Sequence, residues 1–274
     1  MAVIRETLAK SILGKSGISD YCVNCYTGCL HNCIYCYARF MKRFTGHDEP
    51  WGEFLDIKVN APEILAKEVR RHPPGRVFFS SVCDAYQPAE QKYELSRRCL
   101  GILLDAGYHV GILTKSALVA RDLDIMRGHS NAEIGMTITT MDESIRTKIE
   151  PAASSSAERI NTLRRAADAG VMIYTFLGPF MPFLTDTEEQ LDRLIGEVSK
   201  LPIDHAYADK LNARPGVWNS VVQYLHNYHP ELIEPTRRVL FNEDDAAAYK
   251  AELGHRLRTI AAAHGVGDKL NAIL

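Results

Sequence analysis

The sequence has no run of about 18 apolar residues, the shortest stretch expected of a membrane-spanning helix. Its first residues, MAVIRETLAKSILGKSG, lack the apolar core of a signal peptide. It also lacks an excess of positive charge, because 32 Lys and Arg stand against 34 Asp and Glu, a net charge of −2. We therefore expect a cytoplasmic protein with no membrane contact. Its surface is not built mainly for nucleic acid, which still allows a local basic groove.

Internal repeats and low-complexity runs are absent too, and 274 residues suit one large domain or two small ones. Apolar β-branched runs alternate with amphipathic ones along the chain. The candidate strands are Val77–Val82, His109–Thr114, Glu133–Thr139, Val171–Leu177, Ala206–Leu211 and Arg238–Phe241. The candidate helices are Pro62–Arg71, Ala89–Ala106, Leu118–Arg127, Ser156–Ala169, Thr187–Lys200, Val217–Tyr228 and Glu243–His264. This alternation predicts an α/β fold with a parallel sheet, curved into a partial TIM-type (β/α)6 barrel.

Cysteine is unevenly distributed, since five of the seven lie between Cys22 and Cys36. In a reducing cytosol such crowding indicates metal ligation rather than disulfides. Cys29, Cys33 and Cys36 form C-x3-C-x2-C, and three thiolates in one loop can bind three irons of a [4Fe–4S] cluster. The alternative is a zinc site, which normally brings two separated ligand pairs. For Cys22 and Cys25 we favour non-ligand roles over a second metal or redox thiols.

The stretch NCYTGCLHNCIYCYARF resembles the N-terminal signature of the spore photoproduct lyase family of radical S-adenosylmethionine (SAM) proteins, N-P-Y-x-G-C-x-x-x-C-x-Y-C-Y-A. Further blocks fit the same family pattern: Trp51–Gly52, Lys58–Ala61, Ser81–Glu90, Thr114–Ser116, Arg121–Asp122, Thr137–Thr140, Glu150–Pro151, Arg159 and Asp209–Asn212. Cys25 stands where the family usually has Pro, and Cys83 where many members have Thr. The spore enzyme itself is also expected to have a longer region before its cysteines.

This resemblance implies a single radical SAM domain over 1–274. Its parts would be an N-terminal extension (1–20), an iron–sulfur loop (21–40), a barrel (41–241) and a C-terminal helical segment (242–274). SAM would bind the open iron and be cleaved reductively to methionine and a 5′-deoxyadenosyl radical. The electron would come from a donor such as flavodoxin or ferredoxin.

A damaged pyrimidine in DNA is the substrate that the family suggests, and a small molecule or a peptide is the alternative. An alternative function from another class of protein is a non-catalytic iron–sulfur or zinc-binding module. A structural metal module needs no SAM pocket, so residues that could bind SAM discriminate between the two.

Several side chains at predicted strand ends are candidates for binding SAM. The family pattern places Lys115 against the SAM carboxylate, with a strand-end cap as the alternative. Thr137 and Thr139 could bond the ribose or methionine part, although β-propensity alone would also place Thr there. Tyr35 is expected to pack beside the cluster or to touch adenine.

The candidates for radical chemistry and substrate contact follow the same strands. Cys83 could donate a hydrogen atom, or be a buried small residue; the family's donor aligns with Ser81, on the same strand face. Tyr35 and Tyr37 could relay a hydrogen atom, or only pack. Six loop residues are expected around the substrate, with turn formation as the alternative for some: Asp84, Tyr86, Gln87, Lys210, Asn212 and Arg214.

Overall fold

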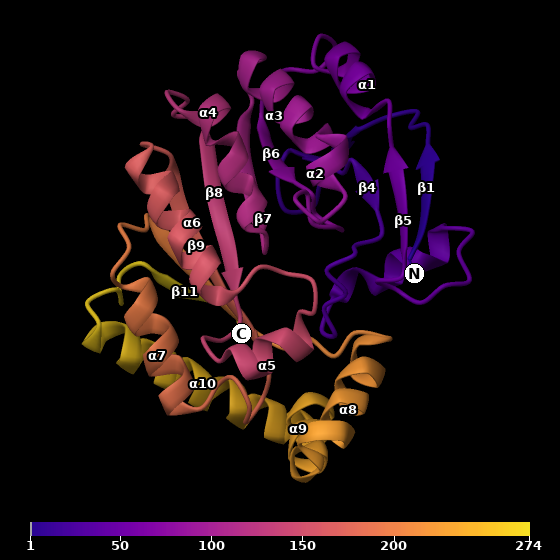
Figure 1. Ribbon diagram of the computed structural model, residues 1–274. Helices are drawn as coiled ribbons and strands as arrows, with labels where there is room; N and C mark the ends of the chain where they lie inside the picture. The colour runs from indigo at the N-terminus through magenta and orange to yellow at the C-terminus, as the bar shows by residue number, and fades with distance from the viewer. Residues whose placement is uncertain (1) are drawn as a thin grey trace.

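The main sheet of the computed structural model, which describes residues 2–274, has eight strands in the order β11-β10-β9-β8-β7-β6-β3-β2 (Figure 1). The strands are β2 (Leu13–Lys15), β3 (Tyr21–Val23), β6 (Arg76–Phe79), β7 (His109–Thr114), β8 (Ala132–Ile138), β9 (Met172–Phe180), β10 (His205–Lys210) and β11 (Leu270–Ala272). All neighbours from β3 to β11 pair in parallel, and β2 is antiparallel to β3. The edges β2 and β11 stay apart in this order, so the sheet is an open partial barrel. The predicted fold class is confirmed.

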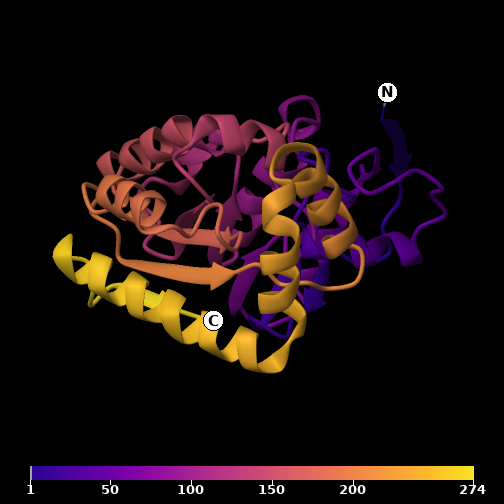
Figure 2. The same cartoon turned by 90° about the horizontal axis from the view of Figure 1, so that it is seen from below.

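Helices follow most of these strands and cover the sheet (Figures 1 and 2). They are η1 (Tyr37–Phe44), α1 (Ala61–Glu68), α2 (Glu90–Tyr93), α3 (Leu95–Asp105), η2 (Ala117–Asp122), α4 (Leu123–Met126), α5 (Glu143–Ile149), α6 (Ser156–Asp168), α7 (Glu188–Val198), α8 (Val217–Tyr228), η3 (Pro230–Leu232), α9 (Ile233–Phe241) and α10 (Glu243–Ala263). Local chemistry sets the helix ends. Ser155 and Glu158 form a capping box at the start of α6. Gly170 follows that helix with φ +77°, which turns the chain into β9.

The core lies between the sheet and the helices. Alternate residues of β8, Ile134 and Met136, are fully buried together with Ile112 of β7. They belong to one apolar cluster with Leu103 of α3 and Leu163 of α6. Burying each such side chain contributes about 1.5–3 kcal/mol, so this layer fixes the sheet that carries the loops.

A second, three-stranded sheet lies beside the first, in the order β1 (Val3–Thr7), β5 (Phe54–Lys58), β4 (Tyr26–Thr27). The strand β4 belongs to the cysteine loop and is antiparallel to β5. This small sheet therefore ties the start of the cysteine loop to the chain that follows it.

Two predicted elements were wrong in part. The segment Arg238–Phe241 is not a strand but the end of α9. The inward-facing residues of α9 follow helical spacing: Ile233, the buried Thr236 and Leu240 share one face of the helix. Ile233 and Leu240 pack on the second apolar cluster. The single predicted helix Ala89–Ala106 is interrupted by Glu94 at φ 48°, which separates α2 from α3.

The carboxyl ends of the parallel strands of the main sheet point to one side, the lower side in Figure 1. Figure 2 views the molecule from that side, with α8 and α9 in front. The cysteine loop follows β3 and therefore leaves the sheet at this edge. None of the helices within residues 2–274 is long and apolar enough to cross a membrane.

Candidate active site

Three free thiols lie in one loop between β4 and η1. Cys29 and Cys33 are buried, and Cys36 is half-buried. Two tight turns shape this loop: the Asn32 amide donates to the Cys29 carbonyl at 3.3 Å, and the Cys36 amide to the Cys33 carbonyl at 3.2 Å. The three cysteines that the motif predicted as metal ligands therefore lie in one loop that these turns shape.

The electrostatic surroundings of these thiols are mixed. Burial raises the pKa of Cys33 to about 12, and the nearby Lys115 ammonium opposes that rise. The pKa of Cys36 is raised by burial as well, against Lys115, the Ala38 amide, Arg39 and the Trp51 indole. A buried thiol becomes a thiolate only with compensating positive charge, which bound iron would supply.

Gln87 holds the backbone on both sides of Cys29. Its side chain is fully buried; Oε1 accepts from the Leu30 amide at 2.9 Å, and Nε2 donates to the Gly28 carbonyl at 3.3 Å. Gly28 has φ +92°, and a Cβ there would lie 2.5 Å from the Phe54 carbonyl oxygen, so only glycine fits. Gln87 was predicted to contact substrate; in the structure its amide is used to hold the loop.

Asp84 also holds the cysteine loop, from the chain that follows β6. One carboxylate oxygen accepts from Thr114 Oγ1 at 2.6 Å, and the other from the Lys115 amide at 2.9 Å. His31 Nδ1 of the cysteine loop lies 3.3 Å from the same carboxylate. Burial works to raise the pKa of Asp84, but His31 and Lys115 outweigh it and hold that pKa well below its usual range. The ionised Asp84 thus joins the loop after β6 to β7 and to the cysteine loop.

A buried network anchors the second half of the cysteine loop. The Tyr35 hydroxyl donates to Glu150, whose other oxygen pairs with the fully buried Arg159. Thr139 Oγ1 lies 2.8 Å from Glu150, and the Ile34 amide donates to the Ile149 carbonyl at 3.0 Å. The hydroxyls of Tyr35 and Thr139, both predicted to contact SAM, are therefore engaged inside the protein. The motif blocks contained Glu150 and Arg159, but spacing alone gave them no role.

Lys115 lies at the end of β7 beside the cysteines. Within residues 2–274 its ammonium makes no ion pair. Burial would lower the pKa of Lys115, but electrostatic interactions with Cys33 and with the Asp84 and Glu150 carboxylates outweigh it and raise that pKa. Thr137, at the end of the next strand, is buried, and its carbonyl accepts from Arg159 at 2.9 Å. Of the predicted SAM contacts, Lys115 has the free charged group.

Tyr37 and Arg214 meet at the outer rim. Tyr37 is 46% exposed, and its hydroxyl donates to the Ser81 carbonyl. The Arg214 guanidinium, from the loop after β10, lies 5.7 Å from the centre of the Tyr37 ring. Asn212 is exposed in that loop and Lys210 is half-exposed. The structure thus brings the cysteine loop and the β10–α8 loop into contact.

Cys83 and Tyr86 lie in different surroundings. Cys83 is half-buried and packs against the apolar group that contains Cys29; burial raises the pKa of its thiol to about 12. Its Sγ lies 3.8 Å from Asn24 Oδ1. Tyr86 is fully buried in the main core, so its ring does not reach the rim where substrate contact was predicted.

The remaining cysteines do not join the three. Cys25 and Cys99 are both fully buried, with their sulfurs 3.6 Å apart. Cys22 is half-buried on β3, and its Sγ lies 3.9 Å from the Lys15 carbonyl oxygen. In the part of the chain that the structure describes, no three His, Cys, Asp or Glu side chains, those of Cys29, Cys33 and Cys36 included, are grouped to hold a metal ion.

Two buried nitrogen donors beside the cysteine loop had no assigned role in the sequence. Trp51 Nε1 and Arg39 Nε have no hydrogen-bond partner within residues 2–274. Trp51 packs with Cys29, and Arg39 Nη2 donates to the Cys33 carbonyl at 2.9 Å. Free N–H groups facing thiols suit a sulfur-rich group, because such groups accept hydrogen bonds at sulfur. The donors and the three thiols therefore fit an iron–sulfur cluster.

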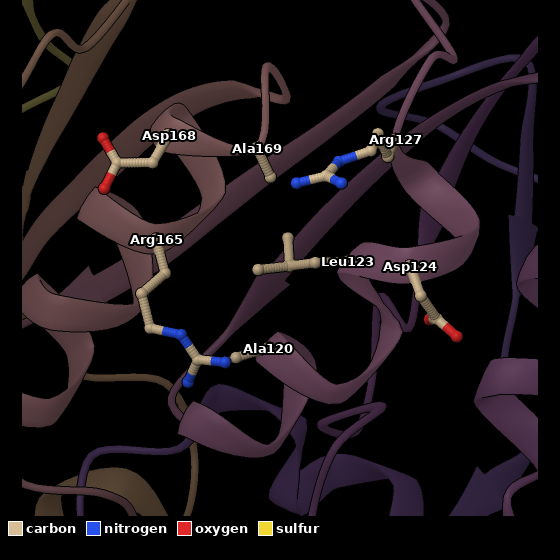
Figure 3. A pocket seen from close by; sticks show the side chains of 7 residues that line it. All are labelled: Ala120, Leu123, Asp124, Arg127, Arg165, Asp168 and Ala169. Carbon is tan, nitrogen blue, oxygen red and sulfur yellow. The ribbon is translucent and has the colours of Figure 1, made fainter.

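A surface hollow of about 400 Å³ lies elsewhere. Its lining comes from η2, α4 and the end of α6 (Figure 3): Ala120, Leu123, Asp124, Arg127, Arg165, Asp168 and Ala169. These segments precede β8 and β9, so the hollow is at the amino ends of the strands, opposite the cysteines. Its two arginines are exposed, and it shares no residue with the predicted site.

Comparison with known proteins identifies the family to which the chain is similar. Residues 23–195 match the family model of the radical SAM superfamily. An uncharacterized protein of Methanocaldococcus jannaschii is 34% identical over 216 residues, 79% of each chain. An uncharacterized protein of Mycobacterium tuberculosis is 28% identical, over 85% of this chain and 72% of its own.

Among solved structures, spore photoproduct lyase complexed with a dinucleoside spore photoproduct matches with a TM-score of 0.74 at 14% identity. The match covers 98% of this chain and 81% of that one. A mutant of the same lyase with bound AdoMet gives a TM-score of 0.72. At this identity, the likeness shows a shared fold.

Proposed function

Because this chain belongs to the radical SAM superfamily, we propose that Cys29, Cys33 and Cys36 bind three irons of a [4Fe–4S] cluster and that Lys115 binds the carboxylate of SAM. One observation carries the proposal: an ammonium without an ion pair stands beside two thiols of the motif. When bound, the cluster supplies the electron that cleaves SAM to methionine and a 5′-deoxyadenosyl radical. A non-catalytic metal module would have no use for this lysine.

In this proposal the residues of the chain bind SAM and orient it. Lys115 offers a charge-assisted hydrogen bond, which is stronger than a neutral one. Thr137 ends the neighbouring strand, so its side chain is the remaining candidate for the ribose or methionine part of SAM. Tyr35 and Thr139 act indirectly in this proposal, because their hydroxyls fix the loop through Glu150. The half-closed sheet and its loops would keep water from the reacting atoms.

After a hydrogen atom has been taken from the substrate, the substrate radical needs a partner. Cys83 is the candidate hydrogen donor, because burial keeps its thiol protonated and it packs against the group that contains Cys29. Tyr37 is the candidate relay residue, since it is exposed at the rim and joined to Ser81. Cys83→Ala should leave SAM cleavage intact and change the product.

The substrate we propose is a damaged pyrimidine in DNA. Support comes from the fold shared with a lyase solved with a dinucleoside spore photoproduct, and from basic side chains on the loop after β10. Lys210, Asn212 and Arg214 would contact the phosphates or bases. A small molecule or a peptide is the alternative, and it needs no such basic contact. We propose flavodoxin or ferredoxin as the electron donor.

The test is anaerobic reconstitution with iron and sulfide, followed by dithionite and SAM. We expect 5′-deoxyadenosine to be released slowly even without substrate. Replacing Cys29, Cys33 or Cys36 by Ala should abolish release, whereas Cys22→Ala, on the same segment, should not. Iron binding with no 5′-deoxyadenosine would favour the non-catalytic module and contradict the proposal.

A further inference from the structure

Trp51 carries a buried indole N–H group beside the cysteine loop. The side chain is only 4% exposed, and Nε1 has no hydrogen-bond partner within residues 2–274. An unsatisfied buried donor costs about 1–3 kcal/mol, so native proteins retain few of them. This indole N–H is therefore placed to donate to sulfur, since no nitrogen or oxygen of the described residues accepts it.

The indole packs against an aromatic pair. Its ring meets Phe54 edge to face, with centroids 5.8 Å apart, and His47 stacks on Phe54 with centroids 4.2 Å apart. The adjoining Gly52 has φ +98°, and a Cβ there would lie 2.1 Å from Asn32 Oδ1 of the cysteine loop. Glycine at this position allows the Trp51 turn to approach the cysteine loop closely.

The indole lies beside the cysteine sulfurs. Trp51 belongs to a small apolar cluster with Cys29, Ala38 and Phe54, and Cys36 packs against the same group. The chain thus presents this indole beside two of the three cysteines.

We propose that Trp51 donates its indole N–H to a sulfur atom of the cluster held by Cys29, Cys33 and Cys36, and thereby sets the reduction potential of that cluster. This inference rests on the proposed function, because it requires the cluster. Hydrogen bonds to the sulfurs are a principal control of iron–sulfur potentials. A donor stabilises the reduced state more, since that state carries the additional negative charge.

The experiment compares the reduction potential of the reconstituted wild-type chain with that of Trp51→Phe, which keeps an aromatic ring and removes the N–H. We expect a similar iron content and a more negative potential, by about 59 mV if reduction becomes tenfold less favourable. Trp218→Phe is the matched control, because it alters the other tryptophan, which packs on Phe241 at 5.4 Å. It should leave the potential unchanged.

A second variant tests the same N–H in case Trp51→Phe does not fold. In the Trp218→Phe background, Trp51 is the one remaining tryptophan, so a benzothienyl analogue of tryptophan is incorporated at position 51 alone. The analogue has sulfur in place of the N–H and keeps the shape of the ring. The same negative shift would support the proposal; an unchanged potential would overturn it. If the wild-type chain takes up no iron, the proposed function fails as well; normal uptake with equal potentials contradicts the role of Trp51 alone.

Discussion

The two sides of the site at the carboxyl edge of the sheet differ in how firmly they are held. On the cysteine side, Gln87, Asp84 and Glu150 each bond the loop from another part of the chain. On the other side, the loop after β10 is largely exposed beyond the buried Leu211, and Arg214 lies over the Tyr37 ring. Polar side chains are thus used to position the metal ligands, while the side proposed for substrate keeps its charged groups free.

This difference separates positioning from binding. A buried, paired carboxylate or amide contributes to holding the loop, and its loss should weaken the fold or the cluster. An exposed cation contributes little to the fold, and its loss should appear only in substrate affinity. Changes on the two sides therefore test the contrast directly.

The largest effect is expected from Glu150→Gln. This change leaves the fully buried Arg159 without its anionic partner, which should cost about 3–5 kcal/mol of unfolding free energy. Urea denaturation of the apo-protein measures it. The matched control is Glu234→Gln, whose Arg237 pair is exposed and should contribute no measurable stability. Equal stability of the two variants would remove the contrast between buried and exposed pairs.

Gln87→Leu should act on the cluster as well as on the fold. It removes both hydrogen bonds that flank Cys29, and loss of such supporting contacts costs about 10–100-fold in metal affinity. Iron release to a chelator measures it. Asn60→Leu is the matched control, because Asn60 clamps the Ala9 backbone with the same two bonds, at 2.8 and 3.0 Å. Equal iron release from the two variants would show that Gln87 supports only the fold.

Lys115→Ala should weaken SAM binding about tenfold or more, the usual range for a hydrogen bond between charged groups, and leave the iron content unchanged. Equilibrium binding to the reconstituted protein measures this. Lys148→Ala is the control, since Lys148 is exposed and contacts the Tyr228 ring, with its ammonium 4.2 Å from the ring centre. Unaltered SAM affinity in Lys115→Ala would remove this lysine from the proposed site.

The smallest effect on the protein itself should come from Arg214→Ala. Stability and iron content should remain unchanged, because Arg214 is exposed and makes only a ring contact. If DNA is the substrate, affinity should fall and the salt dependence of binding should decrease by about one ion. DNA binding that is insensitive to salt in the wild type would favour the small-molecule alternative.

Much of the fold could be predicted from sequence, because the alternation of apolar strands and capped helices is a local signal. The short strands β3 and β11 were not predicted, since three residues give no periodicity. The segment Arg238–Phe241 was misassigned because a run of four apolar and basic residues suits a strand or a helix. Boundaries set by one residue in a left-handed conformation, such as Glu94, are equally hard to predict.

In the site, cysteine spacing predicted the ligand loop, since ligands close in sequence must be close in space. The roles of Gln87 and Asp84 could not be predicted, because a polar residue in a loop can face substrate or backbone, and only tertiary contacts decide between these. Trp51 was visible as part of a motif block, but its unpaired N–H appears only when the surrounding chain is in place.

We propose above all that Cys29, Cys33 and Cys36 hold a cluster with one iron open to SAM. The most direct test is the Mössbauer spectrum of the protein reconstituted with iron-57, recorded with and without SAM. We expect about four irons per chain in a [4Fe–4S] cluster, with one iron site changing its signal when SAM is added. Stoichiometric zinc with no iron uptake, or a cluster whose spectrum is unaffected by SAM, would contradict it.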